Sequence, residues 1–172
     1  MKRCNHQLIS WVIMAVIATC AWCETANAQR AGALEISKEQ YERYPVWDAP
    51  AGAGNAESSV DLRRYLPPVG DQGNQASCVG WAVAYGSRSY SQAQHDGIEP
   101  VRRDRQFSPA FIYNQINGGA DQGSYVVDAL ELLRSHGCAT MAMMPYDDGN
   151  FRRQPEFNAL VKAKEYRIRG FG

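Results

Sequence analysis

The stretch from Pro68 to Ala82 constrains this chain more than any other. It reads PVGDQGNQASCVGWA: a glycine-rich polar loop runs into a series of small residues, and Cys78 stands at the junction, six residues after Gln72. The small residues predict a helix from Ser77 to about His95, capped by Ser77. The first turn of a helix presents free N–H groups that stabilise a thiolate. The pattern therefore predicts a nucleophilic cysteine beside an amide side chain that can hold an oxyanion.

The first 28 residues differ in character from the rest. Lys2 and Arg3 precede an apolar run, and Ala26-Asn27-Ala28 forms a small-x-small cleavage pattern. This arrangement predicts a signal peptide over residues 1–28 and an exported protein, periplasmic or secreted. The alternative is a membrane anchor, but the run is shorter than the ~20 apolar residues that a spanning helix needs. We therefore expect no stable membrane anchor after signal cleavage.

Charge and motif content narrow the classes of function. The 172 residues include 18 basic and 18 acidic side chains, which balance to a net charge of zero. That balance gives no sign of a nucleic-acid partner. We find neither a phosphate-binding glycine motif nor a cysteine or histidine cluster with metal-ligand spacing, so no cofactor and no metal are expected.

The cysteines bear on the nucleophile hypothesis directly. Three of the five lie within the predicted signal peptide, which leaves Cys78 and Cys138 in the mature chain. Exported proteins often pair such cysteines in a disulfide. A permanent Cys78–Cys138 bond would consume the nucleophile, so the catalytic interpretation requires both thiols to be free. We favour a buried free thiol for Cys138, because it precedes apolar residues.

Two further parts of the chain follow the predicted signal peptide. Residues 29–58 are rich in alanine and glycine and are predicted to be a flexible linker or leader, with one helical turn near Ser37–Arg43. Residues 59–172 are predicted to fold, with helices after Ser108-Pro109, from Ser124 to Gly137 and from Gln154 to about Lys164. The alternating residues 166–171 favour a strand. Met141, Met143 and Met144 are expected in the core.

Residues 59–172 resemble the papain-like cysteine peptidases, most specifically around Cys78. The segments that carry the resemblance are SVDLR at 59–63, residues 68–82, Ser108-Pro109, QGSY at 122–125 and MPY at 144–146. The resemblance implies an α+β papain-like fold, here mainly its helical left-hand domain, truncated before the β-rich domain. It also implies an extended peptide or protein substrate. Cys78 would be the attacking thiolate, Gln72 the oxyanion donor, and Gly123, Ser124 and Tyr125 the substrate-binding segment.

Several positions depart from the family pattern. Val79 stands where the family usually has an aromatic residue, and Gln75 where it commonly has a disulfide cysteine. Ala76 and Ser124 replace glycines, and Ser124 would narrow the substrate segment. The leader is also shorter than the long inhibitory propeptide of many members, so inhibition by that route is not expected.

No histidine stands at the expected spacing. The family base follows its cysteine by ≈ 130–150 residues, whereas this chain has only His6, His95 and His136. We therefore expect an exported cysteine endopeptidase (a hydrolase acting through a thioester at Cys78) that is inactive as this chain, with a further C-terminal domain supplying the base. The alternatives are a non-catalytic peptide-binding module that keeps the groove, and a fragment of a broken reading frame.

Overall fold

The structure, a computed structural model, describes residues 31–46 and 59–171. The predicted signal peptide, residues 1–28, lies outside these ranges, as do residues 29–30 and 47–58 of the predicted linker. Within the described ranges, no helix combines the length and the apolar character needed to cross a membrane. The described elements in chain order are β1 (Ala33–Leu34), α2 (Lys38–Tyr41), η2 (Arg63–Tyr65), α3 (Cys78–Gly80), η3 (Trp81–Arg88), α4 (Ser89–Asp96), α5 (Pro109–Ile116), β2 (Ser124–Tyr125), α6 (Val126–Ser135), α7 (Phe157–Ala163) and η4 (Lys164–Tyr166).

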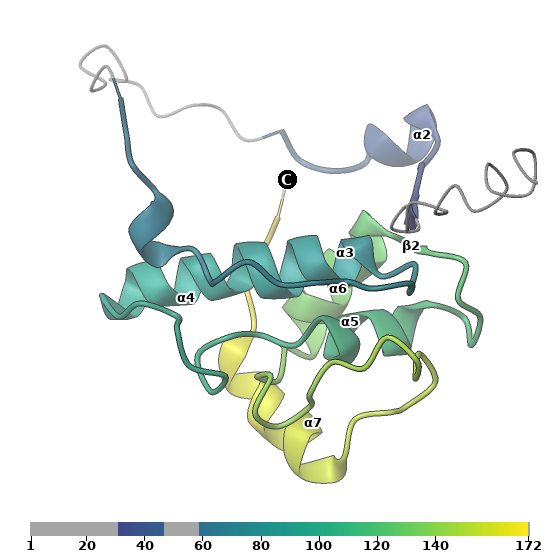
Figure 1. The fold of residues 1–172 in the computed structure, drawn as a ribbon. Helices are drawn as coiled ribbons and strands as arrows, with labels where there is room; N and C mark the ends of the chain where they lie inside the picture. Colours follow the sequence, from purple (N-terminus) through teal and green to yellow (C-terminus); the bar gives the residue numbers. More distant parts are fainter. Residues whose placement is uncertain (1–30, 47–58, 172) are drawn as a thin grey trace, which may run out of the picture.

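One long helix organises the fold. Elements α3, η3 and α4 follow each other without a break from Cys78 to Asp96, and α5 and α6 pack against the α3–η3 part. Figure 1 shows this helix running across the molecule, with α7 on the side away from α2. Its middle part, η3, has the wider π-helical winding, which is uncommon and often occurs near functional sites.

The helices form close to where the sequence predicts them, for identifiable reasons; α7 begins at Phe157, three residues after the expected Gln154. Ser108 caps α5 by accepting the N–H of Phe111, and Pro109 occupies the first helical position, as expected. Leu133 and Ala129, one turn apart on α6, are buried in the core. The core is built mainly from α5, α6, η3 and the loop after α6, and its most deeply buried members include Phe107, Phe111, Ile112, Cys138 and Met144.

Three local predictions are wrong. Ser77 precedes the long helix but makes no capping bond, because its hydroxyl pairs with the Tyr146 hydroxyl at 2.6 Å. The helix expected from Ser124 begins at Val126, since Ser124 and Tyr125 form β2. Residues 167–171 are not a strand; instead the Ile168 N–H bonds to the carbonyl of Leu133 on α6.

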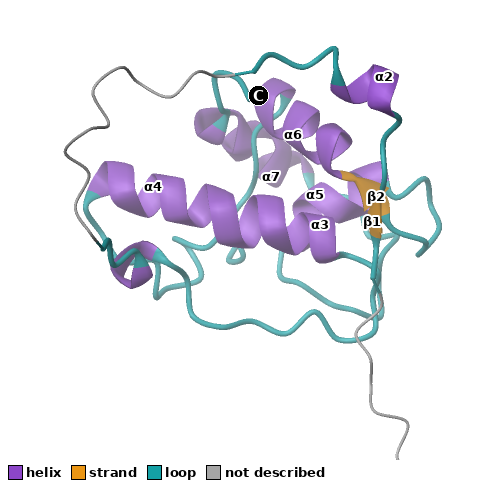
Figure 2. Ribbon diagram, turned by 90° about the horizontal axis from the view of Figure 1, so that it is seen from above, coloured by secondary structure: helices purple, strands orange, loops and turns teal. Residues whose placement is uncertain are grey.

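The leader segment, which we define as residues 31–46, is ordered against the helical domain. The helical turn expected near Ser37–Arg43 is confirmed as α2, and Ser37 and Gln40 form a capping box at its start. Strand β1 pairs in parallel with β2, with Ala33 opposite Ser124 and Leu34 opposite Tyr125. Figure 2 shows this pair at the α3 end of the long helix. The sequence predicts no such pairing.

Candidate active site

Cys78 opens the long helix, as its position after a glycine-rich loop predicts. It is the first residue of α3 and is half-buried, so its sulfur lies at the surface of the core rather than within it. The sulfur is not in a disulfide. It accepts a hydrogen bond from the backbone N–H of Gly32 at 3.2 Å. An accessible thiol at a helix N-terminus is the arrangement that nucleophilic chemistry requires.

Gln72 is buried in the loop before Cys78. Its Nε2 donates to the carbonyl of Gln75 at 2.7 Å, which fixes the side chain against the turn that leads into α3. The assignment of Gln72 as an oxyanion donor stays a prediction.

Tyr146 bonds to the loop that leads into Cys78, a role that sequence reasoning missed. Its hydroxyl donates to the carbonyl of Gln72 at 2.7 Å and also contacts the Ser77 hydroxyl at 2.6 Å. Its ring meets the Trp81 ring edge to face, with 4.9 Å between centroids. Burial raises the pKa of the Tyr146 phenol, so it remains a hydrogen-bond donor at neutral and mildly alkaline pH. The Met-Pro-Tyr resemblance was the only sequence signal for this residue.

The predicted substrate segment, residues 123–125, is paired with backbone of the same chain, namely the leader segment. The Ser124 N–H donates to the Gly32 carbonyl at 2.8 Å, and β1 continues the pairing along β2. Gly123 has a φ of +94°, and a Cβ there would overlap the Gly32 carbonyl, so glycine is needed for this approach. Ser124 is buried, whereas Tyr125 is partly exposed. The predicted segment therefore binds extended backbone in this structure.

The leader segment also covers part of the thiol, which stays half-buried rather than enclosed. Gly32 is buried where it bonds to Cys78, and a Cβ on it would overlap the carbonyl oxygen of Ala76. Beyond β1, an apolar cavity of about 520 Å³ lies between the leader and α6; Leu34, Ile36, Val126 and Leu130 are among its lining residues. The ring of Tyr44 contacts that of Phe171 at 5.5 Å between centroids. The short leader thus lies against the predicted site residues, a contact that the sequence does not predict.

Neither described histidine lies near Cys78. His95 follows it by 17 residues along one continuous helix, which places them roughly 20–25 Å apart at up to about 1.5 Å per residue. The His95 Nδ1 contacts Asp96 instead, at 3.0 Å. His136 follows the last residue of α6, the end away from β2, and contacts Ser135 at 2.8 Å. Both imidazoles are exposed. The described residues therefore supply no imidazole to this thiol, and His6 lies outside them.

Cys138 is a buried free thiol, as predicted. Its side chain has no exposed surface, and burial raises the pKa of its thiol well above the ordinary value. Of the three methionines expected in the core, Met141 and Met144 are buried, and Met143 is only partly buried against it.

The two thiols should consequently react very differently. Iodoacetamide is expected to label Cys78 in the folded chain while sparing Cys138, because alkylation needs an accessible thiolate. Peptide mapping by mass spectrometry at pH 7.5 measures this, and labelling in urea serves as the control in which both thiols react. Equal rates at the two cysteines in the folded state would contradict the burial difference.

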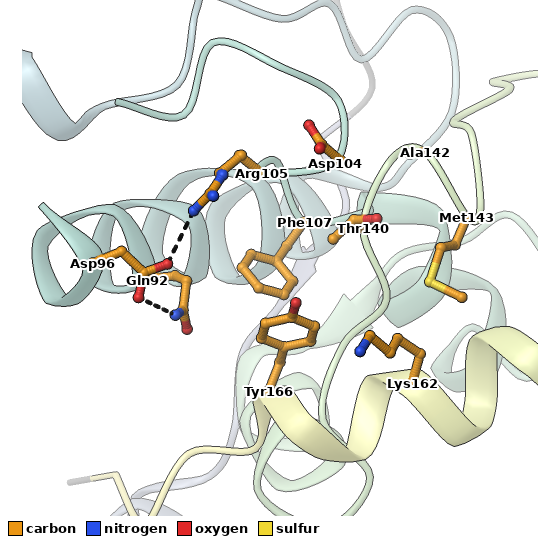
Figure 3. A pocket seen from close by; sticks show the side chains of 10 residues that line it. All are labelled: Gln92, Asp96, Asp104, Arg105, Phe107, Thr140, Ala142, Met143, Lys162 and Tyr166. Atoms are coloured by element: carbon orange, nitrogen blue, oxygen red, sulfur yellow. Dashed lines mark hydrogen bonds and ion pairs between the residues drawn. The ribbon is translucent and has the colours of Figure 1, made fainter. Parts of the chain in front are cut away.

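A second cavity, also of about 520 Å³, lies between α4 and α7, away from Cys78 (Figure 3). The rings of Phe107 and Tyr166 meet edge to face within it, at 4.9 Å between centroids. Its two cations are already paired, Arg105 with Asp96 at 3.2 Å and Lys162 with a neighbouring glutamate at 2.6 Å. It contains none of the predicted site residues, and we assign it no role in the chemistry.

Comparisons with known proteins bear on the fold. No protein-family model matches the chain, and no curated protein matches it. Among solved structures, the fold is similar to that of xylellain, a cysteine protease from Xylella fastidiosa, with a TM-score of 0.62 and 22% sequence identity. The match covers 83% of this chain and 57% of the xylellain chain, so this chain spans little more than half of that protein. This similarity supports a papain-like fold. It does not assign roles to individual residues of this chain.

Proposed function

We propose that this chain carries the nucleophile-bearing part of an exported papain-like cysteine endopeptidase, with Cys78 as its nucleophile. One observation carries the proposal: an extended stretch of backbone, the leader segment, pairs with the predicted substrate strand β2 and bonds to the Cys78 sulfur. A groove that takes extended backbone and ends at an accessible thiol is suited to a peptide substrate.

The chemistry follows from the residue types. The Cys78 thiolate attacks the carbonyl carbon of the scissile bond, and the Gln72 amide with the Cys78 N–H stabilises the oxyanion that forms. The C–N bond breaks and the leaving amine takes up the proton that the Cys78 thiol gave up on ionising. Water then attacks the thioester carbonyl, its hydroxyl stays on the released acid, and its other proton returns to the Cys78 sulfur. Gly123, Ser124 and Tyr125 align the peptide for this attack.

The chain as given should be nearly inactive, for two independent reasons. The leader segment occupies the groove, and neither described histidine lies near enough to Cys78 to exchange protons with it. Strand β1 of the leader segment, which occupies the groove, runs in the same direction as β2. We expect hydrolysis of a fluorogenic peptide to be at or near background.

A covalent probe tests the proposal without requiring turnover. In the Gly32→Ala variant, whose added Cβ would overlap the Ala76 carbonyl oxygen and displace the leader segment from the groove, a peptidyl chloromethyl ketone should label Cys78 faster than chloroacetone, which carries the same electrophile without the peptide. The reason is that the open groove aligns the peptide portion. Cys78→Ala is expected to abolish this labelling, whereas the matched variant Cys138→Ala should retain it. The measurement is intact-mass and peptide-mapping mass spectrometry over time. If the peptide portion gives no rate advantage, the peptidase proposal fails.

A second candidate, a non-catalytic peptide-binding module, is favoured by one observation. The described residues place no imidazole beside Cys78, yet the groove holds backbone in an extended form. For such a module, Cys78→Ala would leave peptide affinity unchanged, and no chain of any length would hydrolyse peptide. Peptide hydrolysis by a longer natural chain, lost in Cys78→Ala, would exclude it.

A further inference from the structure

Asp121 connects the nucleophile loop to a distant part of the groove. Its Oδ1 accepts a hydrogen bond from the backbone N–H of Ala76 at 2.8 Å, although 45 residues separate the two in sequence. Ala76 is buried and stands two residues before Cys78. The same carboxylate oxygen accepts a bond from the Tyr113 hydroxyl at 2.7 Å.

Tyr113 extends this connection to the peptide-binding strand. It belongs to α5, and its side chain is fully buried. Its hydroxyl oxygen accepts the backbone N–H of Gly123 at 3.3 Å, the residue immediately before β2. One series of hydrogen bonds therefore runs from Ala76 through Asp121 and Tyr113 to Gly123.

This series of hydrogen bonds joins the loop before Cys78 to the peptide-binding strand β2, whose relative position must be kept for catalysis. The nucleophile comes from one segment and the peptide from the other, and small errors in their separation reduce the attack rate strongly. Hydrogen bonds to a carboxylate are stronger than neutral ones, and linked bonds reinforce each other in a buried setting. Cys78 and Cys138 are both free, so no disulfide between described residues performs this task.

We propose that Asp121 is a positioning residue that holds the Cys78 loop in register with the peptide-binding strand. It acts through the Ala76 N–H on one side and through Tyr113 on the other, and it does not contact the reacting atoms. The inference rests on the function proposed above, in that the register it sets is that of a peptide on β2 and the thiol of Cys78.

The test compares two electrophiles on the full chain carrying Gly32→Ala, a substitution whose added Cβ would overlap the Ala76 carbonyl oxygen and displace the leader segment from the groove. A peptidyl chloromethyl ketone needs the thiol and the strand in register, whereas iodoacetamide needs only the thiol. Asp121→Ala should lower the ratio of the two Cys78 labelling rates by about tenfold or more, the effect expected for losing a hydrogen bond to a charged group. Asp121→Asn keeps an acceptor oxygen in place and should stay within about threefold of the original ratio. A merely structural role would change both rates together.

A second measurement keeps the inference testable if Asp121→Ala does not fold or if the peptidyl reagent labels no variant. Hydrogen exchange at the Ala76 amide should speed up about tenfold or more in Asp121→Ala or, failing that, in Asp121→Gly. Tyr113→Phe should speed up exchange at Gly123 while Ala76 stays protected. Failure of the peptidyl reagent alone counts against the peptidase proposal, whereas unchanged Ala76 exchange or an unchanged rate ratio would overturn the role of Asp121.

Discussion

Replacing Gly32 by alanine should expose the Cys78 thiol. The added Cβ would overlap the carbonyl oxygen of Ala76, which is backbone and has little room to move, so the leader segment must leave the groove. Its departure breaks the bonds from Gly32 to Cys78 and from Ser124 to Gly32. At roughly 1 kcal/mol net for each bond, alkylation of Cys78 should accelerate on the order of 30-fold.

The measurement is the rate of iodoacetamide labelling at Cys78, followed by peptide mapping. Gly86→Ala is the matched control, because a Cβ there meets nothing closer than 3.6 Å and lies within the long helix. We expect this control to label at the original rate. If Gly32→Ala and the bulkier Gly32→Val also label at the original rate, the leader segment does not protect the thiol.

Replacing Gly137 by alanine should destabilise the folded chain severely. Gly137 follows α6 with a φ of +80°, and a Cβ on it would overlap the carbonyl oxygen of Ala163 at the end of α7. The variant therefore incurs backbone strain of about 1–3 kcal/mol and a clash between two packed segments. We expect the free energy of unfolding to fall by about 3–5 kcal/mol, at the upper end of single-substitution effects.

Gly97→Ala separates the strain from the clash. Gly97 ends α4 with a φ of +69°, yet nothing lies within 4 Å of the position its Cβ would take. It should therefore lose only about 1–2 kcal/mol, the ordinary cost of the left-handed conformation for a residue with a Cβ. Urea denaturation followed by circular dichroism measures both variants. A loss of equal size in the two would show that the Gly137–Ala163 approach is unimportant.

The sequence predicted helix starts and burial correctly where interactions between residues close in the chain determine them. Ser108 and Pro109 begin α5 because a capping hydroxyl and a preset φ act within a few residues of the chain. Cys78 falls at the start of a helix for the same kind of reason, since glycines and polar residues end where small residues begin. Cys138 is buried as its apolar context predicts.

Predictions from local sequence failed where a hydrogen-bonding group pairs with a residue far away in the chain. Ser77 has the side chain of a good cap, but its hydroxyl bonds to the Tyr146 hydroxyl, 69 residues away, and makes no bond to the helix N–H groups. Residues 167–171 alternate like a strand but have no strand beside them within the described chain, and Ile168 bonds to α6 instead. Ser124 and Tyr125 leave the predicted helix because Gly32–Leu34 supplies a backbone partner.

The sequence by itself determined the candidate nucleophile, its helical setting and the order of the helices, since these depend on residue types and on spacings of a few positions. Only the tertiary structure decided that the leader segment lies on β2 and bonds to Cys78, and that Asp121 and Tyr113 join the two sides of the groove. These contacts link residues far apart in the chain. Their formation depends on how the helices bring such segments together, which spacing along the sequence does not encode.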